Sequence, residues 1–297
     1  MCTAKVIVDN GVSTAWLGYE KRPDQYLIET WHGSIGIKKF GRDSNKDMHW
    51  LSVAEKEGKM TDFIISNSDF EDDVYREDFW KDTTIWKFGH ARNDILFADE
   101  ETLKALKKKI TKKFGVPEDV HICLYGPTFR DDGDLSPYTI DYEHLAASLA
   151  TRFGGKWVIF TRFHPRIKKL TKNLSFQKMV VNVSDYLDIQ ELMAIVDVGI
   201  TDYSSWICEY MLRRKPGFFF ATDYEEYAKT NRSFFFPLTD YPFPVAGDED
   251  TLFENILAFD NEKYVDEVNT FLTEKGSVDD GHAAERIAAE IKKLINE

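Results

Sequence analysis

Short apolar runs alternate with longer amphipathic stretches almost from end to end of the chain. The apolar runs predict β-strands at residues 5–8, 26–29, 62–66, 84–88, 121–125, 157–163, 178–183, 196–201 and 217–221. The amphipathic stretches predict helices, among others at residues 102–114, 142–152, 189–196, 205–214 and 283–296. Strands that alternate with helices indicate an α/β fold built on parallel sheets with helices on both faces.

The length of 297 residues and the hydrophobic content of 43% suit two lobes of ordinary domain size. We expect the boundary within residues 89–99, which would separate a Rossmann-like lobe at residues 1–100 from a second one at residues 101–280. The first lobe contains few predicted strands for a doubly wound domain, so we expect it to be shortened. The last helix, within residues 281–297, is expected to pack back across the lobes.

The net charge of −13 argues against duplex nucleic acid as a partner, because that binding requires many cationic side chains. Basic residues cluster at 104–113 and 162–172. The first cluster fits either a solvated helix face or contact with an anionic membrane surface or polymer. The three cysteines lack metal-ligand spacing, and no signal peptide or long apolar run is evident. We therefore expect a cytoplasmic protein, or one peripheral to the inner face of the membrane.

Polar side chains follow several predicted strands directly, where ligands of open parallel sheets bind. His32 follows the strand at 26–29, Arg130 follows the strand at 121–125, and Arg162 and His164 lie at the end of the strand at 157–163. Ser204 and Ser205 follow the strand at 196–201. The topology therefore predicts that two histidines, arginines and a Ser-Ser pair reach the carboxyl edges of the sheets.

Ser204 and Ser205 stand where a strand turns into a helix, so their hydroxyls and the free N–H groups there can bind a pyrophosphate. The alternative is plain helix capping by a serine or by Asp202. Arg162 and His164 point to the same face of their strand, which suits contact with a phosphate. For His164 the alternative is a core histidine bonded to the backbone.

His32 is followed by Gly33, which permits close approach of a ligand, and a neutral histidine can accept a proton from an attacking hydroxyl near pH 7. Lys38 and Lys39 follow and can balance phosphate charge. The alternative is a structural histidine beside buried Trp31. The sequence contains neither a P-loop nor GxGxxG, and Asp202 alone is weak evidence for Mg²⁺, so we expect chemistry without a metal or other cofactor.

Taken together, these motifs resemble those of the CDP-glycerol glycerophosphotransferases, the teichoic acid primase and polymerase family of GT-B-like fold. The resemblance spans roughly residues 5 to 260 and rests on four motifs in the same order: Thr-Trp-His-Gly at 30–33 with Lys38, Gly-Pro-Thr-Phe-Arg-Asp at 126–131, Arg-Phe-His-Pro at 162–165, and Thr-Asp-Tyr-Ser-Ser at 201–205. Residues 89–94 (Gly-His-Ala-Arg-Asn-Asp) also resemble the family's Gly-x-Pro-Arg-x-Asp segment, with alanine in place of proline.

The resemblance implies a transferase that binds CDP-glycerol, or CDP-ribitol, between an acceptor-side first lobe and a nucleotide-donor second lobe. An acceptor hydroxyl attacks the phosphorus nearest the polyol, and CMP leaves. The implied residue roles are, in order, the general base His32, the phosphate-binding residues His164, Arg130, Arg162, Lys38, Ser204 and Ser205, and the nucleotide-binding residues Thr201, Asp202 and Glu209. The implied acceptor is a lipid-linked or polymeric polyol phosphate.

Two departures from the family limit what the resemblance implies. Only 30 residues precede Trp31, fewer than family members usually carry, which fits a shortened first lobe. The residues after His32 read Gly-Ser-Ile-Gly-Ile-Lys-Lys rather than Gly-Thr-Pro-Leu-Lys, so capsule synthesis fits as well as wall teichoic acid synthesis. A glycosyltransferase that uses a sugar nucleotide, and a non-catalytic nucleotide-binding remnant, remain as alternative functions.

Overall fold

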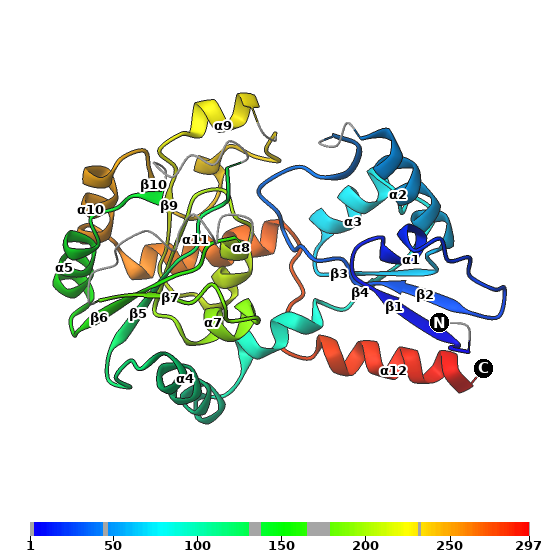
Figure 1. Ribbon diagram of the computed structural model, residues 1–297, viewed down its shortest axis with the longest axis horizontal. Helices are drawn as coiled ribbons and strands as arrows, with labels where there is room; N and C mark the ends of the chain where they lie inside the picture. Colours follow the sequence, from blue (N-terminus) through cyan, green and yellow to red (C-terminus); the bar gives the residue numbers. More distant parts are fainter. Residues whose placement is uncertain (1–2, 44–46, 131–137, 165–178, 231–232, 297) are drawn as a thin grey trace. The chain divides into compact units, whose positions relative to one another are not determined.

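The computed structural model of the chain describes residues 3–43, 47–130, 138–164, 179–230 and 233–296. The chain forms two compact units: unit 1 comprises Met1–Phe97 and Leu272–Glu297, and unit 2 comprises Ala98–Phe271. Each unit is built on a parallel β-sheet with helices, which confirms the predicted α/β class (Figure 1).

The sheet of unit 1 has four parallel strands in the order β1-β2-β3-β4. Their bounds are β1 Val6–Asp9, β2 Tyr26–Glu29, β3 Phe63–Ser66 and β4 Thr84–Lys87. The connections carry α1 (Ser13–Trp16), α2 (Met48–Met60) and α3 (Asp69–Glu77). Right-handed crossovers that add each new strand on the same side place their helices on one face of the sheet. Figure 1 shows these three helices together on one face.

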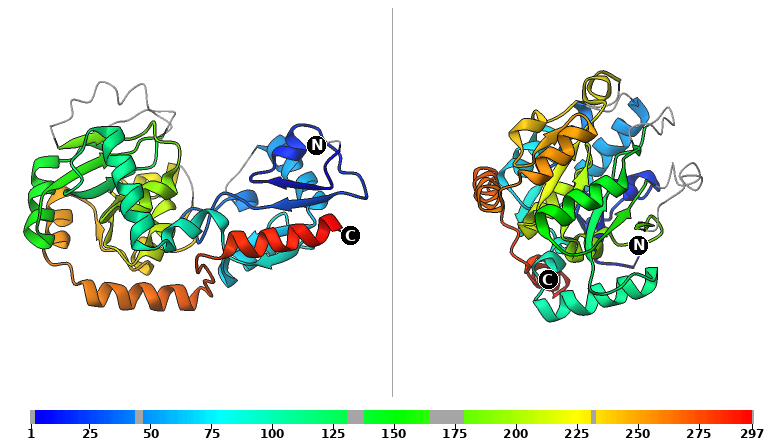
Figure 2. Two further views of the ribbon diagram at one scale, coloured as in Figure 1. Left: turned by 90° about the horizontal axis from the view of Figure 1, so that it is seen from below. Right: turned by 90° about the vertical axis from the view of Figure 1, so that its left-hand side faces the viewer.

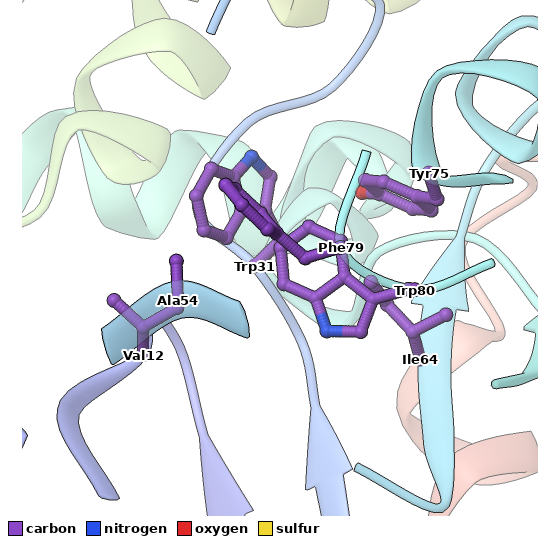
Figure 3. Close-up of a cluster of buried hydrophobic side chains, with 7 residues drawn as sticks. All are labelled: Val12, Trp31, Ala54, Ile64, Tyr75, Phe79 and Trp80. Carbon is purple, nitrogen blue, oxygen red and sulfur yellow. The ribbon is translucent and has the colours of Figure 1, made fainter. Parts of the chain in front are cut away.

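A hydrophobic cluster lies between this face of the sheet and its helices. Figure 3 shows its members, which come from the β1–α1 loop, the β2–α2 connection, α2, β3 and the region around α3: Val12, Trp31, Ala54, Ile64, Tyr75, Phe79 and Trp80. The indole rings of Trp31 and Trp80 meet edge to face, with centroids 5.2 Å apart. Trp31 is therefore anchored in the core of unit 1, directly before His32.

The other face of the same sheet is covered by α12 (Ala283–Asn296), the last helix of the chain. Ile287 and Leu294 of this helix are buried in one cluster with Ile28 and Ile65 of the sheet. Both views of the ribbon show α12 lying along the sheet of unit 1 (Figures 1 and 2). The C-terminal segment thus belongs to the first unit. Its helix α12 covers the face of the sheet that the three crossover helices, all on the other face, leave open.

Asp94 fixes the start of α12. It lies in the 3₁₀ segment η2 (Ala91–Phe97), within the Gly-His-Ala-Arg-Asn-Asp sequence, and its two carboxylate oxygens accept the N–H groups of Ala283 at 3.0 Å and Ala284 at 2.8 Å. A carboxylate at a helix N-terminus satisfies free N–H groups and interacts favourably with the helix dipole. This part of the family-like segment therefore has a structural role.

We expect Asp94→Ala to lower the free energy of unfolding of unit 1 by about 1 kcal/mol, the usual cost of losing an N-terminal cap. Urea unfolding followed by tryptophan fluorescence measures this change. Asp73→Ala, at an exposed position of α3, is the matched control. Equal stability of the two variants would contradict the capping role.

The sheet of unit 2 has six parallel strands in the order β10-β9-β8-β5-β6-β7. Their bounds are β5 His121–Tyr125, β6 Trp157–Thr161, β7 Val180–Asn182, β8 Val198–Thr201, β9 Gly217–Phe220 and β10 Val245–Ala246. Counted from β5, this is the Rossmann order 3-2-1-4-5-6, whose direction reverses between β5 and β8. The carboxyl ends of β5 and β8 therefore mark the expected ligand site of this unit.

The described helices of unit 2 flank this sheet. Their bounds are α4 Glu100–Phe114, α5 Tyr142–Phe153, α7 Ile189–Ile195, α8 Trp206–Tyr210, α9 Tyr224–Thr230, α10 Glu249–Leu257 and α11 Asn261–Glu274. The helix predicted at residues 205–214 is shorter than expected, because it passes into a 3₁₀ turn at Met211–Arg213 and ends at Arg214 with φ 52°. In the described part of the chain, no helix combines the length and apolar character needed to cross a bilayer.

Candidate functional site

The ends of β5 and β8 are tied together by hydrogen bonds in unit 2. The hydroxyl of Thr201 donates to the carbonyl of Gly126 at 2.7 Å, and the indole N–H of Trp206 donates to the same carbonyl at 2.9 Å. Asp202 accepts the N–H of Thr128 at 2.8 Å. Thr201 and Asp202, predicted to bind nucleotide, are both buried, and these hydrogen bonds tie the two strand ends together.

Arg130 lies at the centre of this arrangement and is only 5% exposed. Its guanidinium binds Asp223 through two hydrogen bonds, of 2.6 and 2.8 Å, and donates to Asp202 at 2.8 Å. It also donates to the carbonyl of Thr128 at 2.7 Å. These bonds occupy four of the five N–H groups of the guanidinium.

Three tyrosine rings surround the Arg130 guanidinium. Its carbon lies 4.9 Å from the ring centre of Tyr227, 5.2 Å from that of Tyr203 and 5.8 Å from that of Tyr138. Burial by itself would lower the pKa of Arg130, but the hydrogen bonds and charges of Asp223 and Asp202 raise it above its ordinary value. The guanidinium of Arg130 therefore stays charged beside Asp223 and Asp202.

Arg162 and His164 follow β6, as predicted. The guanidinium of Arg162 is half-buried and donates to the carbonyls of Tyr186 and, at 3.5 Å, Leu187. Burial lowers the pKa of Arg162. His164 is exposed, and its ring centre lies 4.4 Å from that of Phe129. His164 is therefore not a core histidine.

Parts of two motifs lie outside the described residues, namely Asp131, Pro165 and the rest of the basic segment up to residue 172.

Ser204 and Ser205 are half-buried where β8 turns into α8. Ser205 occupies the N-cap position, and its side chain makes no capping hydrogen bond there within the described structure. The carboxylate of Asp202 is engaged by Thr128 and Arg130 instead. Plain side-chain capping thus does not explain this Ser-Ser pair. Glu209, within α8, is buried and accepts a hydrogen bond from Gln190 at 2.8 Å.

His32 lies in unit 1, three residues after β2 ends at Glu29, and it is exposed. Its Nδ1 is 3.1 Å from the carbonyl oxygen of Asn10, and its ring centre is 4.2 Å from that of Trp31. Burial of part of the ring lowers the pKa of His32 below its ordinary 6.5, and the charge of Arg92 acts in the same direction. The imidazole is therefore neutral at pH 7. Lys38 is half-buried in the same β2–α2 connection.

Three buried carboxylates lie at the ends of β1 and β2 and on α2, and the sequence analysis did not identify them. Oxygens of Asp9, Glu29 and Glu57 lie within 4.8 Å of one another. The spacing would admit a cation, but all three side chains accept backbone N–H groups, so we assign the cluster to the backbone rather than to a metal. A signal existed in the sequence, because Asp9 and Glu29 each end a strand whose other residues are largely apolar.

The cluster makes the stability of unit 1 depend on pH. Burial raises the pKa of Glu29 and of Glu57 from 4.5 to about 7. The folded state therefore binds these protons more tightly than the unfolded state. The resulting stabilisation is complete below pH 4.5 and is lost as the pH rises through about 7.

We expect Glu57→Gln to remove part of this dependence. Between pH 5 and pH 8.5 the wild-type chain should lose roughly 2 kcal/mol more unfolding free energy than the variant. Urea unfolding at both pH values measures the difference, with Glu77→Gln at an exposed position of α3 as the control. If the unfolding free energies of the wild type and of Glu57→Gln changed equally with pH, the proposed contribution of Glu57 would be contradicted.

A cavity of about 490 Å³ opens elsewhere on unit 1. Thr61, which precedes β3, and Thr83, which precedes β4, are among its lining residues. The cavity is therefore at the amino ends of these strands, whereas His32 follows the carboxyl end of β2. In a parallel sheet the amino ends and the carboxyl ends of the strands lie on opposite sides, so the cavity is not part of the candidate site.

Residues 1–293 match the family described as CDP-Glycerol:Poly(glycerophosphate) glycerophosphotransferase. The teichoic acid poly(glycerol phosphate) polymerase of Staphylococcus epidermidis is 29% identical over 293 residues, which cover 93% of this chain and 40% of that protein. The teichoic acid ribitol-phosphate polymerase TarK of Staphylococcus aureus is 28% identical over 280 residues, 91% of this chain and 53% of that protein. The chain thus spans about half the length of these relatives.

Solved structures show the same likeness. A structure of a variant of the wall teichoic acid polymerase TagF superposes with a TM-score of 0.83 at 28% identity, covering 99% of this chain and 74% of that one. A TagF variant soaked with CDPG gives 0.82 at 28% identity, covering 99% and 73%. The match to the family covers nearly the whole sequence, with both units. The chain therefore belongs to the CDP-glycerol:poly(glycerophosphate) glycerophosphotransferase family.

Proposed function

We propose that the chain transfers glycerol phosphate, or a related polyol phosphate, from a CDP-linked donor to an acceptor hydroxyl, in teichoic acid or capsule-type polymer synthesis. The observation that carries this proposal is the family match over residues 1–293. The TagF structure soaked with CDPG supports a cytidine diphosphate donor. The names of the relatives support a polyol-phosphate polymer as the acceptor.

In this proposal His32 is the general base. The acceptor oxygen attacks the phosphorus nearest the polyol, its proton passes to Nε2 of His32, and the bond from that phosphorus to the bridging oxygen breaks, so CMP leaves. Such a transfer depends mainly on positioning and on stabilisation of the phosphate charge. The lowered pKa of His32 supports its role, since the base has to be unprotonated at neutral pH.

Three of the proposed donor-binding residues have side chains that are exposed or half-buried. His164, exposed beside Phe129, is proposed to contact a donor phosphate together with half-buried Ser204 and Ser205 at the start of α8. Arg162 and Lys38 remain proposed phosphate ligands, and Glu209 a proposed ribose ligand. Arg130 is proposed to act at the phosphate only through the loop that it orders. No metal is part of this proposal.

Association with the inner face of the membrane and a lipid-linked acceptor belong to the same proposal. The basic helix α4 gives this part limited support. Lys109 pairs with Glu191 at 2.9 Å, and Lys107 donates to the carbonyl of Val120 at 2.8 Å, so these two lysines are engaged within unit 2. Lys108 also pairs with Glu118, at 4.0 Å, so a membrane contact would depend more on the exposed lysines Lys104 and Lys112.

The test is to incubate the purified chain with CDP-glycerol and a glycerol-phosphate oligomer and to follow CMP. We expect CMP release that requires the acceptor and continues in the presence of a chelator. His164→Ala should weaken binding of CDP-glycerol in calorimetry. A chain that binds no cytidine diphosphate donor would overturn the proposal, and transfer of a sugar without phosphate would replace it with a glycosyltransferase.

A further inference from the structure

The position of His32 depends on the ends of two neighbouring strands of unit 1, β1 and β2. Asp9 and Glu29 are register partners at the carboxyl ends of the parallel strands β1 and β2. Asn10, directly after β1, supplies the carbonyl oxygen that lies 3.1 Å from Nδ1 of His32. Trp31, shortly after β2, precedes the histidine in the chain. The position of the ring thus depends on how these two strand ends are fixed to each other.

Glu29 fixes the two residues with unusual backbone conformations at this point. Val12 and Trp31 have φ angles of 58° and 50°, in the left-handed region that residues other than glycine rarely adopt. The N–H of Trp31 donates to one oxygen of Glu29 at 2.7 Å, and the N–H of Val12 donates to its other oxygen at 3.4 Å. One buried carboxylate therefore stabilises both unfavourable conformations, one in each strand connection.

The other two acids of the cluster hold the rest of the β1–α1 loop. Asp9 accepts the N–H groups of Asn10 at 2.7 Å and Thr14 at 2.6 Å. Glu57, on α2, accepts the N–H of Ala15 at 2.5 Å. These bonds fix the loop that carries the Asn10 carbonyl. Gly11 of the same loop lies against the imidazole of His32, since a Cβ at Gly11 would lie 3.3 Å from Nδ1 of His32.

The contact with Asn10 determines which ring nitrogen carries the proton. A carbonyl oxygen can only accept a hydrogen bond, so Nδ1 of the neutral ring has to be the protonated nitrogen. Nε2 then keeps its lone pair, which is the form that a general base requires. The positive charge of Arg92 also favours the neutral form of this ring.

We propose that Glu29 is a positioning residue for His32: it holds Val12 and Trp31 so that the Asn10 carbonyl keeps the proton on Nδ1 and leaves Nε2 free to accept one from the acceptor. The catalytic part of this inference rests on the proposed function. The part that concerns the ring does not, because the tautomer of His32 is a property of the chain without substrate.

The test is long-range ¹H–¹⁵N NMR of the chain labelled at histidine, with the His32 signals assigned by their absence in His32→Ala. In the wild type at pH 8 we expect the proton on Nδ1. In Glu29→Gln one N–H loses its acceptor to an amide NH₂, and we expect a mixed population shifted toward the Nε2-protonated form. Glu77→Gln, at an exposed position, should give the wild-type spectrum.

The same variants are then assayed for CMP release. We expect Glu29→Gln to lower kcat by roughly 10- to 100-fold with the KM for CDP-glycerol unchanged, the pattern of a misplaced base. Glu29→Asp, which keeps the charge but is too short to reach both N–H groups, serves in its place if Glu29→Gln does not fold. An unchanged tautomer in the folded variant would overturn the inference. A changed tautomer without any CMP release from the wild type would overturn only the proposed function.

Discussion

Replacement of His32 by alanine is expected to lower acceptor-dependent CMP release by about 10²- to 10⁴-fold, the usual contribution of a general base. Binding of CDP-glycerol should not change, because the proposed role of His32 concerns the acceptor hydroxyl. Steady-state CMP release and calorimetric donor binding measure the two effects separately. His282→Ala is the matched control, since the side chain of His282 is 67% exposed and belongs to the same unit.

The same role predicts the pH profile of kcat/KM. A base has to be unprotonated to act, so the rate should rise with pH through the pKa of His32 and then level off. Because burial lowers that pKa below 6.5, the plateau should be reached by neutral pH. Wild-type rates in His32→Ala, or an acidic limb unaffected by this substitution, would exclude His32 as the base.

Replacement of Arg130 by alanine is expected to cost about 3 kcal/mol of the unfolding free energy of unit 2, because it leaves one buried and one half-buried carboxylate without their cation. These are Asp202 and Asp223, which Arg130 binds at 2.6 to 2.8 Å. Arg130→Lys should recover only part of the loss, since an ammonium cannot reproduce the two-pronged bond to Asp223.

Urea unfolding of both Arg130 variants, with Lys104→Ala at an exposed position as the control, measures this loss. The experiment also separates two roles for Arg130. A direct phosphate ligand would give Arg130→Lys nearly wild-type stability but weak binding of CDP-glycerol. Loss of stability together with loss of donor binding would place Arg130 in the framework of the site.

Much of the fold could be predicted from the sequence because buried parallel strands read as continuous apolar runs. The predicted and observed bounds agree for β2 and β5, and β8 and β9 are buried at every residue. β10 was missed because two residues are too few for any periodic signal. The role of α12 was also not predictable in detail, because its cap, Asp94, is 189 and 190 residues away from the N–H groups that it accepts.

Parts of the candidate site could likewise be predicted from the sequence, and other parts could not. His32 could be singled out because it directly follows a predicted strand and precedes a glycine, and the structure shows it exposed at that strand end. The surroundings of Arg130 could not be predicted, because its partner Asp223 lies 93 residues away and looks like an ordinary surface acid in the sequence. Glu57 is similar, because it looks like an ordinary acid of an amphipathic helix in the sequence, and its backbone partner Ala15 lies 42 residues away.

The measurement that tests the transferase most directly uses CDP-glycerol labelled in its glycerol phosphate, with a glycerol-phosphate oligomer as acceptor. Transfer of the intact polyol phosphate predicts that label in the oligomer and free CMP appear in equal amounts and that both depend on His32. CDP in place of CMP, or label in the oligomer without its phosphate, would contradict transfer at the phosphorus nearest the polyol.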